Sequence, residues 1–451
     1  MNYGDCLKYL DSLGQELHGL TWGLETITKV LARLGNPHLK YSTAIVAGTN
    51  GKGSTAAMLS SILRQAGYRT GLYTSPHLVK VNERMRVDGA DVADDDFARS
   101  FTEVRQVVEG LLEEKTLGKL PSFFEFLTAT GFHYFAQAGV DFVVLEVGMG
   151  GRLDATNVTQ PRVAVITNIG LDHVEFLGST LAAIGREKAG VIKPGTPVVC
   201  GCERGEAAEV IRQRCAELGA ELLETGYVGG LSGMQSLQGH YLFNLSLDAD
   251  FFGSLSSPLL GKFQVENAVA AVTAAWRLSR DGFRITRSAI VKGLQSTSWP
   301  GRLEKVLEHP LVLLDGAHNP AAARVLAEFI QEDLRGRRLR LVYGSMRDKA
   351  MSEISEILFP LAEEVYLTRP HVARAATPEE ILAASRLRPP RLVIEPEPSV
   401  AVERACRASA NEDAVMIVGS LFLVGAVKKA LLEGQLQLAN PVRPATAKGL
   451  V

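Results

Sequence analysis

The sequence has few cysteines and no long hydrophobic run. Five cysteines among 451 residues argue against a disulfide framework and are typical of a protein kept in a reducing cytoplasm. The first residues, MNYGDCLKYLDSLG, lack the basic start and the apolar stretch of a signal peptide. Because no uninterrupted run of about 18 apolar residues occurs, we expect no membrane span and a cytoplasmic location.

An excess of charge of one sign is also missing. The chain has 48 Lys and Arg against 50 Asp and Glu, a net charge of −2. That balance provides no electrostatic footprint for a nucleic acid or an anionic membrane, and we expect neither as a partner. Cys200 and Cys202, in VVCGC, lack a second Cys or His pair at metal-binding spacing, so we interpret them as small buried apolar side chains.

Short apolar runs alternate with helical patterns, which is typical of a parallel sheet flanked by helices. The length favours two domains, and the polar segment STSWPG (296–301) is the predicted linker between a domain at 1–295 and a smaller α/β domain at 302–451. Strands are predicted at 43–48, 70–75, 141–148, 162–170, 196–201, 311–317, 338–345, 364–370, 391–396 and 414–420. Helices are predicted at 54–66, 123–137, 179–190 and 264–280, and a β-rich region at 222–258.

The segments just past five of these strands are polar or rich in glycine. They read GTNGKGS, TSPHL, EVGMGGRLDATN, TNIGLDH and DGAHNP. In open α/β sheets, ligands bind at the carboxyl ends of the strands. Each segment alone could be an ordinary turn, but together they predict a ligand site at that edge.

The segment AGTNGKGST (47–55) is a glycine-rich turn before a predicted helix, which aims backbone N–H groups at an anion. Lys52 adds a point charge for phosphates, and Ser54 adds a hydroxyl for Mg²⁺. The G-x-x-x-x-G-K-[ST] pattern fails twice, at Val46 and at Gly53, so a loop without a ligand is the alternative. The flanking strand and helix favour nucleotide binding. The expected nucleotide contacts are Gly48, Thr49, Asn50, Gly51, Lys52, Gly53 and Ser54.

Six motifs follow one another along most of the chain. They are TNGKGS (49–54), SPHL (75–78), EVGMGGRLDATN (146–157), GLDH (170–173), REKAGVIKP (186–194) and DGAHNP (315–320). In this order they resemble the Mur ligase superfamily and, within it, the folylpolyglutamate and dihydrofolate synthases. The resemblance implies an α/β fold, in which a P-loop-containing, mostly parallel ATPase domain precedes a smaller Rossmann-like glutamate-ligase domain. It also explains the shortened phosphate loop, which members of the family share.

The resemblance implies a reaction as well. ATP would phosphorylate a carboxyl group of a pteroate or folyl-glutamate, and the amine of L-glutamate would attack the acyl phosphate to give an amide, ADP and phosphate. The LDAT wording (153–156) resembles bifunctional bacterial enzymes, which act on dihydropteroate as well as on reduced folates. A folylpolyglutamate synthase without dihydrofolate synthase activity is the alternative. A monomer that uses ATP and Mg²⁺ is implied.

The resemblance places Mg²⁺ ions beside the phosphates. Ser75, Glu146 and His173 would hold one ion, and Ser54 would hold another. Taken singly, these residues could instead be a turn serine, a buried acid and a core histidine. The family carbamylates the lysine that matches Lys188, which turns a cation into a possible metal ligand and requires a neutral amine. A surface lysine on a helix is the alternative.

Contacts with ATP are also implied for the second domain. Asp315 and His318, together with Arg302 and Asn267, would grip the nucleotide, and closure about residues 296–301 would exclude water. A helix-surface amide is the alternative for Asn267, and an interdomain salt bridge for Arg302.

The pterin end of the substrate has its own candidates. An aromatic face could stack on a flat pterin and a carboxylate could pair with its N–H groups, although one of the two adjacent phenylalanines is expected in the core. The candidates are Phe123, Phe124, Glu125, Asp154 and Ala155. The residues implied in catalysis are Lys52, Asp154, His173, Lys188 and His318.

Two other functions remain open from the sequence. Another Mur-type ligase would need a domain for a UDP-sugar before the phosphate loop, and only about 42 residues precede that strand. A P-loop ATPase switch that binds partner proteins would leave DGAHNP and the polar residues at the other strand ends unexplained.

Overall fold

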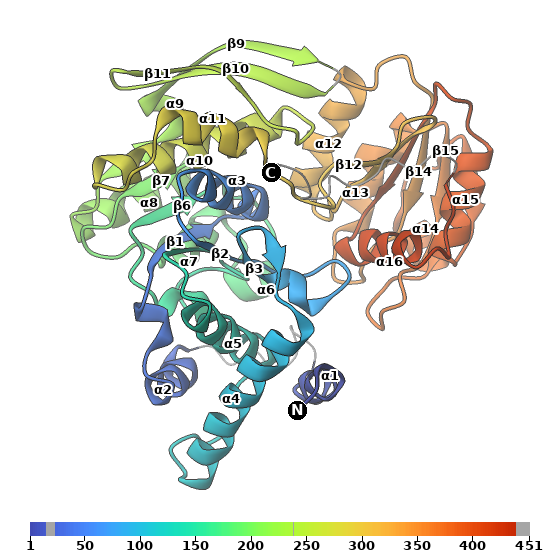
Figure 1. Cartoon of the computed structure of the whole chain (residues 1–451). Helices are drawn as coiled ribbons and strands as arrows, with labels where there is room; N and C mark the ends of the chain where they lie inside the picture. Colours follow the sequence, from blue (N-terminus) through green and yellow to red (C-terminus); the bar gives the residue numbers. More distant parts are fainter. Residues whose placement is uncertain (15–22, 238, 439–451) are drawn as a thin grey trace, which may run out of the picture. The chain divides into compact units, whose positions relative to one another are not determined.

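The computed structural model describes residues 1–14, 23–237 and 239–438. The chain forms two compact units (Figure 1). The amino-terminal unit comprises Met1–Met234, Leu242–Pro258 and Val265–Thr297, and the carboxyl-terminal unit comprises Gln235–Tyr241, Leu259–Gln264 and Ser298–Val451. No helix among the described residues is long and apolar enough to cross a membrane.

An eight-stranded sheet in the order β4-β3-β2-β5-β1-β6-β7-β8 forms the centre of the amino-terminal unit. Its parallel strands are β2 (Thr70–Tyr73), β5 (Phe142–Glu146), β1 (Ser42–Ala47), β6 (Val163–Ile166), β7 (Val198–Cys200) and β8 (Leu222–Glu224). At one edge, β3 (Met85–Val87) and β4 (Ala90–Asp91) run antiparallel. Central strands buried on both faces are continuous apolar runs, as the sequence of β1 and β5 is.

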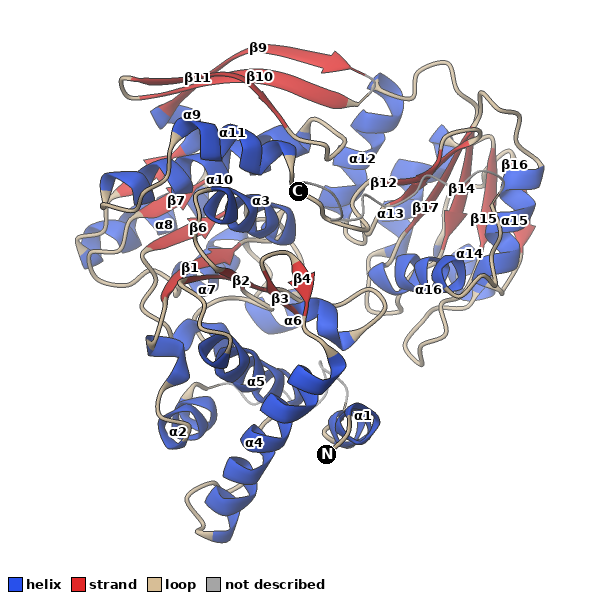
Figure 2. Cartoon of the chain, viewed as in Figure 1, coloured by secondary structure: helices blue, strands red, loops and turns tan. Residues whose placement is uncertain are grey.

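Helices cover both faces of this sheet (Figure 2). On one face, Ile45 of β1 belongs to the same apolar cluster as Val104 and Phe126, which lie on α4 and α5. Elsewhere α11 packs against α3 so closely that a Cβ on Gly293 would lie 2.4 Å from the Cα of Ile62. The helices are α1 (Tyr3–Ser12), α2 (Glu25–Arg33), α3 (Lys52–Gln65), α4 (Asp94–Glu113), α5 (Phe123–Gln137), α6 (Val174–Leu177), α7 (Leu181–Ala189), α8 (Glu206–Leu218), α9 (Thr225–Val228), α10 (Phe263–Arg280) and α11 (Arg287–Gln295).

The predicted β-rich region is a three-stranded sheet in the order β11-β10-β9. It consists of β9 (Gly229–Leu237), β10 (His240–Leu247) and β11 (Asp250–Ser256), and β10 alternates between half-buried and buried residues. That period of two is the pattern of a strand with one covered face.

A six-stranded sheet in the order β12-β13-β17-β14-β15-β16 forms the carboxyl-terminal unit. Only β12 (Glu304–Leu307) runs antiparallel, and β13 (Leu311–Leu314), β14 (Leu339–Tyr343), β15 (Glu364–Leu367), β16 (Arg391–Ile394) and β17 (Ala414–Val418) are parallel. The helices are α12 (Pro320–Glu332), α13 (Met351–Leu358), α14 (Pro378–Ala384), α15 (Pro398–Arg407) and α16 (Leu421–Leu432). The predicted α/β class, with a mostly parallel first sheet and a smaller second α/β domain, is confirmed.

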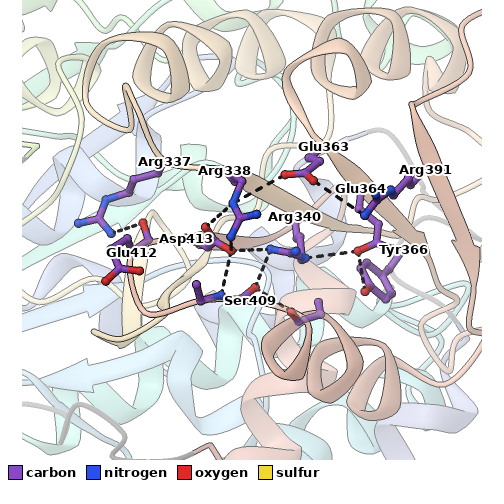
Figure 3. A network of polar contacts seen from close by, with 12 residues as sticks. Arg337, Arg338, Arg340, Glu363, Glu364, Tyr366, Arg391, Ser409, Glu412 and Asp413 are labelled. Atoms are coloured by element: carbon purple, nitrogen blue, oxygen red, sulfur yellow. Dashed lines mark hydrogen bonds and ion pairs between the residues drawn. The ribbon is translucent and has the colours of Figure 1, made fainter.

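A polar network lies at the amino ends of the parallel strands of this second sheet (Figure 3). The guanidinium of Arg340, which is 5% exposed, donates to Asp413 at 2.8 Å, to Ser409 at 3.2 Å and to Glu364 at 3.3 Å. Arg338 donates to both oxygens of Asp413 at 3.0 and 3.1 Å. Each of these carboxylates therefore has a guanidinium partner.

Most of the predicted strands run a few residues past the observed ones. The largest difference is at 162–170, where β6 ends at Ile166. The N–H of Thr167 still donates to the carbonyl of Ala47 at the end of β1, but the hydroxyl of Thr167 donates to the loop after β1 and two oxygens of Asn168 accept from that loop, so the chain leaves the sheet at this point.

Candidate active site

The turn between β1 and α3 is only four residues long, Gly48–Gly51. Val46 lies inside β1 and is fully buried, which explains why a turn glycine is missing at that position. Gly48 has φ +146° and Gly51 has φ +80°. A Cβ on Gly48 would lie 1.9 Å from Oγ1 of Thr167, and a Cβ on Gly51 would lie 2.2 Å from Oδ1 of Asn267. Both glycines are therefore required by backbone angle and by space.

The segment after β6 holds this turn through five hydrogen bonds. The N–H of Thr49 donates to the carbonyl of Asn168, and the N–H of Asn50 donates to the side-chain Oδ1 of the same asparagine, both at 2.9 Å. The hydroxyl of Thr49 donates to the carbonyl of Gly170 at 3.1 Å and accepts from its N–H at 2.9 Å, and the hydroxyl of Thr167 donates to the carbonyl of Asn50 at 2.6 Å.

These contacts show which N–H groups of the loop already have partners within the protein. The N–H groups of Thr49 and Asn50 are already bonded within the protein. The first N–H groups of a helix have no partner inside the helix, so those of Lys52, Gly53 and Ser54 at the start of α3 are the ones suited to an anion. Sequence reasoning missed Asn168, although the TN that precedes its GLDH motif was the available signal.

Two lysines converge on the same loop. Lys52 donates to the carbonyl of Thr49 at 3.1 Å, and Lys188, on α7, donates to the carbonyl of Gly48 at 2.6 Å. Lys188 is only 4% exposed, so it is not the surface lysine of the alternative interpretation. Burial and then the charge of Lys52 lower the pKa of Lys188 to about 7, against the opposing effect of Asp172.

The predicted metal ligands follow neighbouring strands of the sheet. Glu146 ends β5 and is buried, Ser75 follows β2, and the N–H of Ser75 donates to Oε2 of Glu146 at 3.2 Å. His173 caps the short helix α6 after β6, with φ +50°. Ser54 is buried in the first turn of α3. Carboxylate and hydroxyl oxygens suit Mg²⁺, so the chemistry of this donor set fits the ion.

No three His, Cys, Asp or Glu side chains are grouped so that they could hold a metal, as far as the described residues go. Of the five predicted ligands, only Glu146 and His173 are of these types. An ion here would therefore depend on serine hydroxyls and on a modified Lys188. The metal site stays a prediction.

The predicted pterin residues lie around the loop after β5. Asp154 is buried and accepts from the N–H and hydroxyl of Thr156, at 3.0 and 2.6 Å, and from the N–H of Met149 at 3.0 Å. Burial raises the pKa of Asp154 against these hydrogen bonds. Phe124 contacts the same loop, since a Cβ on Gly148 would lie 2.6 Å from its ring. The buried Ala155 begins the turn of 3-10 helix that Asp154 caps.

The other two candidates of this group have local roles in the structure. Glu125 forms a capping box with Ser122, accepting from its N–H at 2.9 Å and its hydroxyl at 2.8 Å, which explains the acid at the start of α5. Phe123 is partly buried against the core, and the guanidinium carbon of Arg84 lies 5.5 Å from its ring centroid. Arg84 is itself 2% exposed and donates to Nδ1 of His77 at 2.9 Å.

Asn267 is not a surface amide of α10. It is 7% exposed, it lies against Gly51, and its Oδ1 accepts from the hydroxyl of Thr55 at 3.5 Å. The amino-terminal unit thus brings Asn267 to the phosphate loop from more than 200 residues away in the sequence.

In the carboxyl-terminal unit, Asp315 ties two loops together. Its oxygens accept from the N–H groups of Leu303 and Ala317, both at 2.8 Å. Burial raises the pKa of this carboxyl, and the charge of Arg302 opposes the shift. The Nδ1–H of His318 donates to the carbonyl of Gly316 at 2.8 Å, which fixes the tautomer of the ring. Asp315 therefore fixes the two backbone segments that contain Arg302 and His318.

Known proteins share this architecture over nearly the whole chain. The model of the Mur ligase middle domain matches residues 127–275, and that of the Mur ligase glutamate ligase domain matches residues 301–421. A dihydrofolate synthase/folylpolyglutamate synthase of Bacillus subtilis is 34% identical over 93% of this chain and 97% of its own length. A folylpolyglutamate synthase of Lacticaseibacillus casei is 33% identical over 96% of this chain and 100% of its own.

A solved structure agrees with these relatives. FolC of Escherichia coli, in complex with DHPP and ADP, superposes with a TM-score of 0.86 and 32% identity, covering 96% of this chain and 99% of that one. At this coverage, the similarity includes both units of the chain. The chain belongs to the dihydrofolate synthase/folylpolyglutamate synthase family of ATP-dependent Mur ligases.

Proposed function

We propose that the chain joins L-glutamate both to dihydropteroate and to the glutamyl tail of reduced folates. The observation that carries the proposal is the contact of 2.6 Å between buried Lys188 and the phosphate loop, at the strand ends where Glu146 and His173 also lie. The Bacillus subtilis relative, named for both activities, supports the pair of substrates. Relatives of nearly full length with these names favour this function over a cell-wall ligase or an ATPase switch.

The chemistry needs a triphosphate and a carboxylate brought together without water. The γ-phosphoryl group of ATP passes to the substrate carboxylate, and the amine of glutamate then displaces phosphate from the acyl phosphate. The N–H groups at the start of α3 and the ammonium of Lys52 would bind and orient the phosphates, since phosphoryl transfer depends mainly on alignment and on charge. Arg302, Asp315 and His318 are the predicted nucleotide ligands of the carboxyl-terminal unit, and Asp315 fixes the backbone next to the other two.

Mg²⁺ would be held by Ser75, Glu146 and His173, with a second ion at Ser54. When bound, the ions neutralise charge on the phosphates. Because burial and the charge of Lys52 lower the pKa of Lys188 to about 7, a neutral amine that can react with CO₂ is accessible near neutral pH. A carbamate keeps one N–H, so the hydrogen bond to the carbonyl of Gly48 can persist while a new carboxylate becomes available.

The substrate side of the proposal assigns Phe124, Asp154 and Ala155 to the pterin. Their support is the packing of Phe124 on the loop after β5 and the buried carboxyl at its end. We further propose that the protein is a monomer and acts in the cytoplasm.

A two-substrate assay tests it. Purified protein receives ATP, Mg²⁺ and labelled glutamate with either dihydropteroate or tetrahydrofolate, and the products are resolved by mass. We expect one added glutamate on the first acceptor and one or more on the second. If glutamate is added to tetrahydrofolate but not to dihydropteroate, the protein is a folylpolyglutamate synthase without dihydrofolate synthase activity. Release of phosphate in the absence of both acceptors would contradict a ligase.

A further inference from the structure

Asn168 uses two different oxygens to bind two consecutive N–H groups of the phosphate loop. Its main-chain carbonyl accepts from Thr49 and its Oδ1 accepts from Asn50, both at 2.9 Å. Consecutive backbone N–H groups of a turn form an anion-binding site in many proteins. Here two neutral oxygens of one residue, the main-chain carbonyl and the side-chain amide of Asn168, accept from them instead.

This arrangement limits where a phosphate can bind. With the N–H groups of Thr49 and Asn50 bonded to Asn168, the anion-binding groups are those that begin α3, beside Lys52. Thr167 restricts the loop further. Gly48 packs against its side chain, and its hydroxyl donates to the carbonyl of Asn50 at 2.6 Å. Gly48 and Asn50 are thus held by contacts within the protein that need no ligand.

We propose that Asn168 is a positioning residue for the phosphates of ATP, which rests on the proposed role of this loop in nucleotide binding. It holds the loop in the shape that directs the phosphates to the first turn of α3, and it fixes that loop to the segment that continues to His173. A loop that is ordered before binding loses less conformational entropy when the nucleotide binds, so the hydrogen bonds of Asn168 should increase the affinity for the nucleotide.

If Asn168 had only a structural role, its truncation would lower stability without changing nucleotide affinity. Asn244 is a matched control for that effect. Oδ1 of Asn244, in the three-stranded sheet, accepts from the N–H of Ser254 at 2.9 Å, the same bond that Asn168 makes to Asn50. Truncating either asparagine removes one amide acceptor from a backbone N–H, which lowers stability by a similar amount. Only truncation of Asn168 should change nucleotide binding.

The test is calorimetric binding of ADP with Mg²⁺ to wild type, Asn168→Ala and Asn244→Ala, with thermal unfolding of each. We expect the Kd of Asn168→Ala to rise about tenfold, which corresponds to the loss of one hydrogen bond, and that of Asn244→Ala to match wild type. In the ligation assay, the KM of Asn168→Ala for ATP should rise while its KM for glutamate stays unchanged.

Equal ADP affinity in wild type and Asn168→Ala would overturn the proposal, whereas failure of wild type to bind ADP would overturn the proposed function itself. If Asn168→Ala does not fold, Thr167→Val and Thr167→Ser replace it. The valine removes the hydrogen bond to Asn50 and should raise the Kd about threefold, while the serine keeps the hydroxyl and should restore wild-type affinity. A valine variant with wild-type affinity would contradict the inference.

Discussion

Buried cations have opposite surroundings in the two large sheets of this molecule: carboxylates in the smaller sheet, and a carbonyl and a second lysine in the larger one. At the amino ends of the strands in the smaller sheet, Arg340 lies among carboxylates, with Asp413 at 2.8 Å and Glu364 at 3.3 Å (Figure 3). At the carboxyl ends of the strands in the large sheet, the equally buried Lys188 donates to a backbone carbonyl and lies within the field of another lysine, Lys52.

The difference separates structure from function. A buried ion network whose members are matched holds strands in register and leaves little capacity for a ligand. A buried lysine close to a second positive charge raises the free energy of the folded state, and such a pair persists where a negatively charged ligand is to be received. The phosphate loop is such a place. The two edges should therefore respond differently to substitution.

Removal of Lys188 should have the largest effect. We expect Lys188→Ala to lower the ligation rate about a thousandfold, because the substitution removes both a loop contact and the proposed metal ligand. Added short carboxylates should restore part of the rate, since a free acid can occupy the space of the carbamate. Steady-state ligation with and without formate measures both effects, and wild-type turnover by the unrescued variant would contradict the carbamate.

A substitution in the polar network of the smaller sheet should lower stability and leave nucleotide binding unchanged. Asp413→Asn leaves Arg338 and Arg340 short of a negative partner, and we expect a loss of about 3 kcal/mol in the free energy of unfolding. Urea unfolding measures the loss, and ADP binding by the folded variant should not change. A weaker ADP affinity with normal stability would erase the distinction between the edges.

The amount by which Lys188 lowers the free energy of unfolding should depend on pH. Its pKa is about 7 in the folded state against about 10.5 for an ordinary lysine, so between these values the unfolded chain binds one more proton and stability rises with pH. Lys188→Met removes this dependence, and its gain in unfolding free energy over wild type should be about 3 kcal/mol larger at pH 6 than at pH 9. Urea unfolding in CO₂-free buffer checks this, and a gain independent of pH would contradict the shift.

An exposed ion pair should matter least. Arg347 and Glu380 are 3.0 Å apart, with each side chain nearly half exposed. Solvent screens such pairs, so we expect Arg347→Ala to change the free energy of unfolding by about 0.5 kcal/mol. A loss as large as that of Asp413→Asn would show that burial is not what distinguishes the network.

Much of the fold follows from local patterns in the sequence. Apolar runs such as 43–48 and 414–420 contain strands of the two sheets, since a strand covered on both faces must be apolar throughout. The end of β6 was missed because the partners of Thr167 and Asn168 come from a loop about 120 residues earlier. Periodicity contains no information on such pairing.

The candidate site divides in the same way. Residue types and motifs indicated the phosphate loop and Lys188, whereas the burial of Lys188 and its hydrogen bond to Gly48 depend on how α7 packs. Glu125 shows that one residue type can have two explanations. Its acid predicts a substrate contact, but its position three residues after Ser122 is also the spacing of a helix cap, and the structure has the cap.

The short turn between β1 and α3 also sets the rotational phase of α3. Successive residues of an α-helix are about 100° apart around its axis, so an inserted residue that joined α3 would turn Ser54 by that angle relative to the packed side chains that follow it. The close contact between Gly293 and Ile62 opposes such a rotation. A longer phosphate loop grafted onto this strand would therefore have to keep its extra residues within the turn.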